Sequence, residues 1–226
     1  SYLGESWLRA KQPENFSKNF YKKYKDKSVT GEVERMLSCP AMQNYSKNVY
    51  AIRSMLDYEI VVEKDFSVTS SIHDQIFFEK YFIVRDANVG LFSLVQPYIF
   101  FTDDPSLEMT WQIHPFLEQP QNYYHIPGKY DIGKWFRSVD FSFLMKDEER
   151  VFSIKNDEIY TYVEFHTSEK INFIKFEPTE KIKFYSQSAI LNNFGTFAKP
   201  RKLSSFYDIF NTKSNILKEI RSCVIE

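Results

Sequence analysis

Glycine, cysteine and long apolar runs are scarce in this sequence. Its 226 residues include only six glycines, so a β-rich chain has to build its turns from Asn, Asp, Ser and Lys. The two cysteines, Cys39 and Cys223, lie far apart and make no disulfide framework, which favours a reducing compartment. The longest apolar region, residues 90–101, is interrupted by Ser93 and Gln96 and is shorter than the ~20 residues that cross a membrane.

An excess of charge of one sign is also missing. The 29 basic and 30 acidic side chains leave a formal net charge of −1, which gives no electrostatic footprint for nucleic acid. Residues 1–8 show no basic segment followed by an apolar run, so we expect no signal peptide. We therefore predict a protein that is not secreted through a signal peptide and that binds neither nucleic acid nor a membrane.

Aromatic residues, in contrast, are abundant, with 22 Phe and 15 Tyr in the chain. Their excess accompanies many Lys, Asn and Ile and little Ala and Gly, which is typical of AT-rich coding sequences. The aromatic count alone therefore indicates no function. A chain of this length can bury roughly 70% of its unfolded surface, which is enough for a sizeable core.

The clearest structural signal is the period-two alternation over residues 128–176. Phe141 and Phe143 share one parity, whereas polar residues occupy the other, as in a strand with one buried face. Polar turns separate the runs at residues 146–150, 155–158 and 167–170. Because parallel neighbours need a long crossover, we predict an antiparallel meander. The expected core residues are Trp135, Phe141, Phe143, Ile159, Val163 and Phe165.

Helices are predicted on both sides of the β region. Phe16, Phe20 and Tyr24 recur at helical spacing, which predicts a helical N-terminal cover over residues 1–48. Residues 177–226 form a C-terminal extension that ends in an amphipathic helix.

The remaining segment, residues 49–176, is predicted to form the sandwich. Besides the meander, it is expected to contain strands at residues 49–63 (two strands), 75–85, 91–101 and 107–113. We find no linker and no internal repeat, so residues 1–226 are predicted to be one domain. The predicted fold is mainly β: an antiparallel β-sandwich, for which a jelly roll is one candidate topology, with N-terminal and C-terminal helices.

The loop at residues 114–131 holds the best polar cluster for a metal site. His114, Glu118, His125 and Asp131 combine imidazole with carboxylate, which suits iron, manganese or zinc. Cupins and non-haem iron enzymes usually space such ligands as His-x-His or His-x-Asp on a strand, and the sequence contains neither. We therefore predict no catalytic residue, no metal and no cofactor. The four residues remain the candidates if the protein is an enzyme.

Other reactive side chains have structural interpretations that we prefer. Cys39 beside Pro40 could be a nucleophile, but a lone Cys more often fills apolar space. Asp103 and Asp104 precede a proline in a turn, where Asp bonds its own backbone. Aromatics that could stack on sugar rings, with the tyrosines expected on the surface, are Trp7, Trp111, Trp135, Tyr123, Tyr124 and Tyr160. Core and interface roles are preferred for them because aromatic residues are so frequent.

The order of several features resembles a family of uncharacterised β-rich phage and bacterial proteins. That family has a Cys-Pro, a Trp before a β-run and an Ile-x-x-Gly-Glu-Pro-like turn. The corresponding features here are Cys39-Pro40, Tyr45, the strands at 50–62, Asp131, Trp135, Phe141, the run Phe152-x-Ile154-x-Asn156-x-Glu158, and Tyr160. The resemblance spans residues 36–165, although residues 156–159 lack the Gly and Pro of the turn. It implies a β-rich fold in a viral or bacterial setting and no catalytic residue.

Two classes of function follow from these patterns. The leading hypothesis is a non-enzymatic viral (phage) structural or assembly protein of the virion or host cytoplasm, with a protein partner or as a homo-oligomer. It depends on the many aromatics and on runs that are apolar on both faces, such as residues 75–82. The alternative is a metal-dependent, cupin-like β-sandwich enzyme that uses the 114–131 loop. A third class, sugar binding, depends on the aromatics alone.

We predict that the purified protein contains no stoichiometric transition metal. His114 and His125 lie eleven positions apart, whereas ligand atoms have to meet at ~2.0–2.2 Å from one ion. Elemental analysis measures the metal content. A stoichiometric metal that is lost when both histidines are replaced by Ala would contradict the prediction and favour the enzyme.

Overall fold

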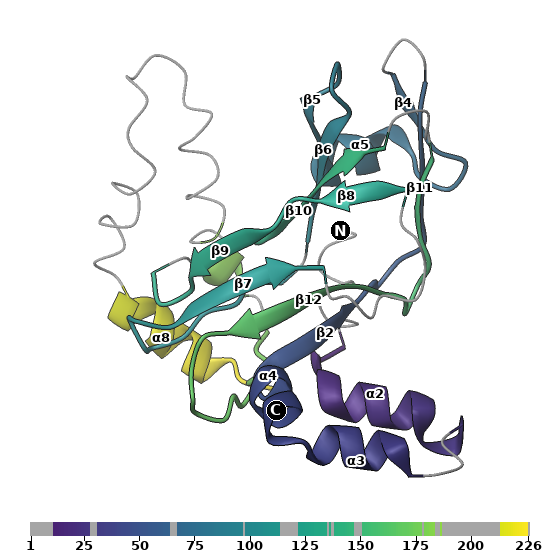
Figure 1. Ribbon diagram of the computed structural model, residues 1–226. Helices are drawn as coiled ribbons and strands as arrows, with labels where there is room; N and C mark the ends of the chain where they lie inside the picture. Colours follow the sequence, from purple (N-terminus) through teal and green to yellow (C-terminus); the bar gives the residue numbers. More distant parts are fainter. Residues whose placement is uncertain are drawn as a thin grey trace.

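The computed structural model shows a mainly β protein built from antiparallel sheets and a few helices (Figure 1). It describes residues 11–27, 31–63, 67–96, 98–113, 122–134, 136, 138–146, 151–177, 179–183, 186 and 213–225. The predicted fold class, an antiparallel β-sandwich-like fold with N-terminal and C-terminal helices, is confirmed. None of the helices within these ranges is long and apolar enough to cross a membrane.

The strands form three sheets, and each paired strand runs antiparallel to its neighbours. The first sheet has the order β1 (Glu14–Asn15), β2 (Val49–Arg53), β12 (Ile159–Phe165), β7 (Glu108–Gln112) and β9 (Gly128–Asp131). The second has the order β5 (Phe82–Asp86), β6 (Leu91–Val95), β10 (Asp140–Met145) and β8 (Tyr123–His125). The third has the order β11 (Val151–Ile154), β3 (Tyr58–Val62) and β4 (Val68–Thr69).

The antiparallel meander predicted over residues 128–176 is wrong. Strands β10, β11 and β12 follow one another in the chain but belong to three different sheets. Strand β11 pairs with β3, and β12 pairs with β2. The consecutive strands β2 and β3 therefore run antiparallel beside the consecutive strands β11 and β12, along one continuous path. Short turns indicate antiparallel chain direction, but they do not require that the strands they join be hydrogen-bonded to each other.

A bonded corner explains this arrangement. The links 54–57 and 155–158 lie side by side where the path bends from the first sheet into the third (Figure 1). The backbone N–H of Ser54 donates to the Glu158 carbonyl, and the N–H of Asp157 donates to the Ser54 carbonyl, both at 2.8 Å. The N–H of Asn156 also donates to the Asp57 carboxylate at 2.9 Å. The link 155–158 also closes its own turn, since the Glu158 N–H donates to the Lys155 carbonyl at 3.1 Å, but the strands that it joins pair with other strands.

The strand predicted over residues 75–85 is wrong in its first part. Residues Gln75–Tyr81 form helix α5, and only Phe82–Asp86 form strand β5. The Asp74 side chain caps the helix by accepting a hydrogen bond from the Phe77 N–H at 2.9 Å. The rings of Phe78 and Phe82 meet edge to face at 5.8 Å, one helical turn apart. This segment is therefore not a strand with two apolar faces.

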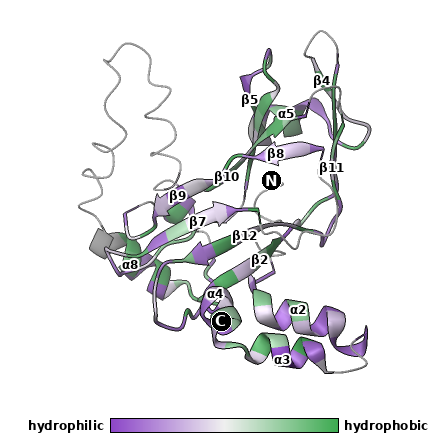
Figure 2. Ribbon diagram, viewed as in Figure 1, coloured by the Kyte–Doolittle hydropathy of each residue, from purple (hydrophilic) through white to green (hydrophobic). Residues whose placement is uncertain are grey.

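The N-terminal cover predicted over residues 1–48 is helical in most of its described part, and residues 1–10 and 28–30 lie outside the described residues. Its helices are α2 (Phe16–Tyr24), the 3-10 turn η1 (Lys25–Lys27), α3 (Glu32–Ser38) and α4 (Pro40–Ser46). Helices α2 and α4 pack against the first sheet through Phe16, Phe20 and Met42. Phe16 is buried with Val49, Ala51 and Tyr162 of the strands beneath it. Figure 2 shows hydrophobic and hydrophilic residues interspersed along α2 and α3, as expected of helices with one covered face. At the other end of the chain lies helix α8 (Lys213–Ser222).

The main apolar core draws side chains from all three sheets. Of the predicted core residues, Phe141, Phe143, Val163 and Phe165 are buried there. Ile159 is only partly buried and packs against the smaller cluster around Phe16. Trp135 lies outside the described residues. The ring of Phe143 stacks on Phe152 of the third sheet with centroids 4.2 Å apart, so this position joins two sheets.

We predict that Phe143→Ala lowers the free energy of unfolding by ~3–5 kcal/mol, as large-to-small aromatic changes in cores do. The neighbouring Leu144 points to the opposite face of β10 and is only partly buried, so Leu144→Ala is the matched control with a smaller loss. Denaturant unfolding measures both. A loss below ~1 kcal/mol for Phe143→Ala would contradict the face assignment.

Candidate functional site

The predicted metal ligands do not form one site within the described residues. His114 and Glu118 lie outside them. His125 ends β8 in the second sheet, where its ring stacks on Phe141 at 4.9 Å. Asp131 ends β9 in the first sheet and forms an ion pair of 2.5 Å with Lys134. In the part of the chain that the structure describes, no three His, Cys, Asp or Glu side chains are arranged to hold a metal ion.

Burial determines the state of the His125 ring. The residue is 8% exposed, and desolvation lowers the pKa of the imidazole to about 4. Its Nε2 atom is buried, and no hydrogen-bond partner for it is found among the described residues. His125 is therefore a neutral core side chain at neutral pH.

The expectation that Cys39 fills apolar space is wrong: Cys39 is exposed and is the N-cap of α4, which begins at Pro40. The outcome for Asp103 and Asp104 is different. The Asp104 carboxylate accepts hydrogen bonds from the backbone N–H of Ser106 at 2.8 Å and from its hydroxyl at 2.7 Å, so the predicted turn is confirmed.

Most of the described aromatic residues that could stack on sugar rings do not lie on the surface. Tyr123 and Tyr160, expected on the surface, are buried in the main core together with Trp111. Tyr124 is the exposed member of the set, at 58%. Trp7 and Trp135 lie outside the described residues. The described aromatics therefore serve packing more than surface recognition.

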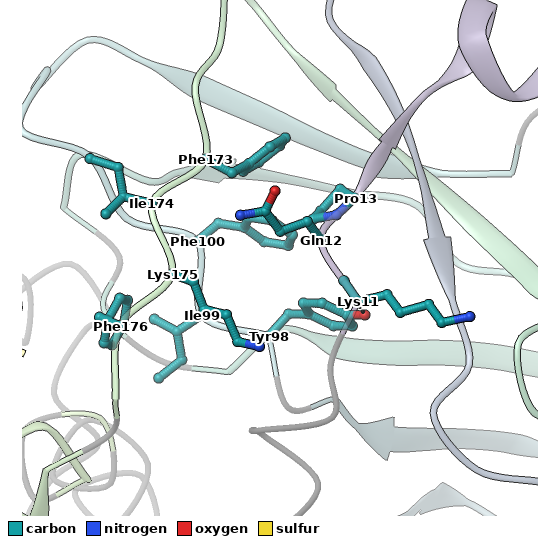
Figure 3. Close-up of a pocket in the computed structure, with 10 residues that line it drawn as sticks. All are labelled: Lys11, Gln12, Pro13, Tyr98, Ile99, Phe100, Phe173, Ile174, Lys175 and Phe176. Atoms are coloured by element: carbon teal, nitrogen blue, oxygen red, sulfur yellow. Dashed lines mark hydrogen bonds between the residues drawn. The ribbon is translucent and has the colours of Figure 1, made fainter. Parts of the chain in front are cut away.

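The structure instead reveals an apolar cleft where three extended segments meet (Figure 3). Residues 11–13 precede β1, residues 98–100 connect β6 to β7, and residues 173–176 follow β12. The cleft has a volume of about 120 Å³. None of these segments was selected as a site from the sequence, because each is an ordinary apolar or polar run and they lie far apart in the chain.

Alternation along residues 98–101 places this cleft between two apolar clusters. Tyr98 and Phe100 belong to the main core, with their ring planes 5° from parallel and 5.8 Å apart. Ile99 and Phe101 point to a second cluster, in which residues Phe136, Ile182 and Ile216 are buried. This segment was predicted as part of a strand over residues 91–101, but β6 ends at Val95. The alternation thus persists beyond β6, where the Val139 N–H still donates to the Tyr98 carbonyl at 3.2 Å, and residues 98–100 line the cleft.

The segment 173–176 supplies the opposite wall and an exposed edge. Phe173 packs on Tyr50 with ring centroids 4.9 Å apart. Phe176 forms a single antiparallel bridge with Val224, and the Ile225 N–H donates to the Lys175 carbonyl at 2.8 Å. Among the described residues, this bridge is all that forms of the strand predicted at residues 171–176.

Two exposed aliphatic side chains lie on the same face of this bridge, and we call them the apolar rim. Ile174, two positions before Phe176, is 62% exposed, and Val224, the bridge partner of Phe176, is 45% exposed. Ile225 is also 45% exposed, but it pairs with Lys175 and points to the opposite face. Ile174 also lines the cleft, so the apolar rim continues the cleft wall outward.

The polar groups of the cleft are few and positively charged. The Lys11 ammonium forms an ion pair of 2.6 Å with Asp157. The Tyr98 hydroxyl lies 3.4 Å from the carbonyls of Lys11 and Arg53. Burial raises the pKa of Tyr98 to about 12, so this hydroxyl remains a neutral donor. The ten described lining residues are mainly apolar, and their polar side chains are Lys11, Gln12, Lys175 and the Tyr98 hydroxyl.

A scan against protein-family models found no match, and searches of curated proteins and of solved structures found none either. The resemblance to phage and bacterial proteins therefore stays a prediction.

We predict that the buried His125 makes stability depend on pH. The pKa is about 4 in the folded protein and 6.5 ordinarily, so the unfolded chain binds the proton between these values. The free energy of unfolding therefore falls as the pH drops from about 6.5 to about 4, in total by about 3 kcal/mol. Denaturant unfolding across this range measures the fall.

The variant His125→Phe keeps an aromatic ring against Phe141 and should lose this contribution. The control is Tyr124→Phe on the same strand, which leaves His125 in place and should keep the wild-type fall. An equal fall in wild type and His125→Phe would show that other groups cause the dependence.

Proposed function

We propose that this protein is a non-enzymatic structural or assembly protein that acts by association with a protein partner or with a second copy. The proposed contact surface is the apolar rim together with the cleft. One observation carries the proposal: Ile174 and Val224 are exposed on one face of the bridge between Phe176 and Val224, beside an aromatic recess.

The physical support is that such a surface is costly to leave in water. Single exposed aliphatic residues are common, but contiguous ones beside a recess are typical of interaction sites. The bridge between Phe176 and Val224 holds the two side chains of the rim on one face. A preformed recess surrounded by apolar contacts is also the arrangement in which interface anchors contribute most of the binding energy.

The proposed setting is a phage virion or the host cytoplasm during assembly. This part of the proposal is supported by the resemblance over residues 36–165 and by no other observation. We do not propose the metal-dependent enzyme, because His125 is enclosed in the apolar core and Asp131 is paired with Lys134.

We predict that Ile174→Glu abolishes association, because the introduced carboxylate would have to be desolvated at the contact. Light scattering measures self-association, and recovery of a partner from the native source measures association with another protein. The matched control is Val89→Glu. Val89 is 58% exposed in the turn between β5 and β6, close to the 62% of Ile174, and its replacement should leave association intact.

Two results would contradict the proposal. One is a wild-type protein that stays strictly monomeric at high concentration and retains no partner. The other is equal association by wild type and Ile174→Glu, which would place the contact elsewhere.

A further inference from the structure

We infer that an ionic lock between Lys11 and Asp157 keeps residues 11–13 closed over the cleft, and that breaking this lock opens the cleft. We call residues 11–13 the strap. The inference rests on the proposed association function, because the cleft belongs to the proposed contact surface, and it specifies how access to that surface is regulated.

The strap lies on one side of the cleft, next to a firmly anchored part of the chain. Figure 3 shows residues 11–13 and 173–176 on opposite sides of the cleft. Shortly after the strap, the Asn15 side chain donates to the carbonyls of Ser46 and Lys47 at 3.2 and 3.1 Å. Movement of the strap therefore ends at β1, and the helices that follow stay in place.

The contacts that the structure shows for the strap itself are weak. Lys11 and Gln12 are exposed, and Pro13 has no N–H to donate to a strand. The ionic lock is an ion pair of 2.6 Å between Lys11 and Asp157, whose side chains are 64% and 50% exposed. The Lys11 carbonyl accepts from the Tyr98 hydroxyl at 3.4 Å, which is longer than usual for a hydrogen bond. An exposed ion pair shifts an equilibrium by about fivefold at most, and salt weakens it.

Arg53 supplies a second partner at both contacts of the strap. Its guanidinium Nε atom lies 4.0 Å from the Asp157 carboxylate, and its carbonyl lies 3.4 Å from the Tyr98 hydroxyl. When the strap moves away, the carboxylate therefore keeps a cation beside it and the hydroxyl keeps an acceptor. A buried polar group that lost its last partner would oppose opening. Because Arg53 prevents this loss, the closed and open forms differ mainly by the ionic lock.

Opening exposes aromatic surface next to the apolar rim. Tyr98 and Phe100 are each 8% exposed in the closed form, with the strap as one wall of the cleft that they line. Without this wall, their rings extend the apolar surface that Ile174 begins. A partner that binds the enlarged surface favours the open form.

Solvent paramagnetic relaxation enhancement tests the inference on the full chain in dilute solution. The Tyr and Phe rings are labelled with carbon-13, and the probe is a neutral gadolinium chelate, whose own approach salt does not steer. We expect the enhancement at the ring protons of Tyr98 and Phe100 to rise about two- to fivefold between about 10 mM and about 1 M NaCl. The reason is that the screening length falls from about 30 Å to about 3 Å over this range.

Two variants remove the ionic lock without added salt. Lys11→Met keeps the apolar stem, and Asp157→Asn keeps a residue type that tolerates the φ of 67° at this position. Both should show the high-salt enhancement already at low salt. The matched control is Lys129→Met, which breaks a similarly exposed ion pair of 2.7 Å with Glu108 and should keep the wild-type response. Thermal unfolding verifies that all three variants are folded.

The inference is overturned if loss of the lock leaves the enhancement at low salt unchanged, or if Lys129→Met raises it equally. The two proposals fail separately. An unchanged enhancement, together with loss of association in Ile174→Glu, rejects the lock and leaves the association function. A raised enhancement in both lock variants, together with normal association of Ile174→Glu, supports the lock and rejects the apolar rim as the contact.

Discussion

The structure depends on the hydrogen-bonded corner at which residues 54–57 meet residues 155–158. Three backbone N–H groups at this corner find acceptors in the opposite link. Ser54 is buried, so its backbone N–H and carbonyl need partners, and the bonds to Glu158 and Asp157 fix where the first sheet ends and the third begins. Asp157 has a φ of 67°, a left-handed conformation that Asp tolerates better than most residues. The main core can then receive side chains from both sheets at once.

The same corner also positions the cleft. The Arg53 guanidinium donates to the Asp157 carbonyl at 2.7 Å, and the Asp157 carboxylate accepts from Lys11 at 2.6 Å. The Tyr98 hydroxyl lies 3.4 Å from the carbonyls of both Lys11 and Arg53. Two of the three segments that line the cleft are therefore attached to the corner through hydrogen bonds. A site made of irregular segments is in this way held by the sheets, as binding loops on a rigid scaffold usually are.

Several elements of the fold could be predicted from the sequence because their signals are local. Period-two alternation identified β2, β3, β7, β10, β11 and β12. Sheet partners could not be predicted, because the alternation determines which face is buried and not which strand lies alongside. The aromatic run at 75–82 is ambiguous for a related reason, because its side chains fit both the strand period and the helix period. The Asp74 side chain caps a helix there.

The candidate site could not be predicted at all. Tyr98 and Phe173 lie 75 positions apart, and neither belongs to a motif. Their proximity is a consequence of tertiary packing, which no local pattern encodes. The sequence indicates the histidines of the 114–131 loop as candidate metal ligands, but His125 is a core side chain whose neighbours are aromatic rings.

The corner also has a consequence for how the chain acquires its structure. Arg53 and Asp157, which it joins, are 104 residues apart. Until residues 151–165 have left the ribosome, β2 can pair only with β1, and β3 only with β4. Closing so long a loop costs entropy before any contact returns it, and folds dominated by such distant pairings form slowly. The nascent N-terminal part therefore carries open strand edges during most of its synthesis, which is the interval in which it is most exposed to aggregation.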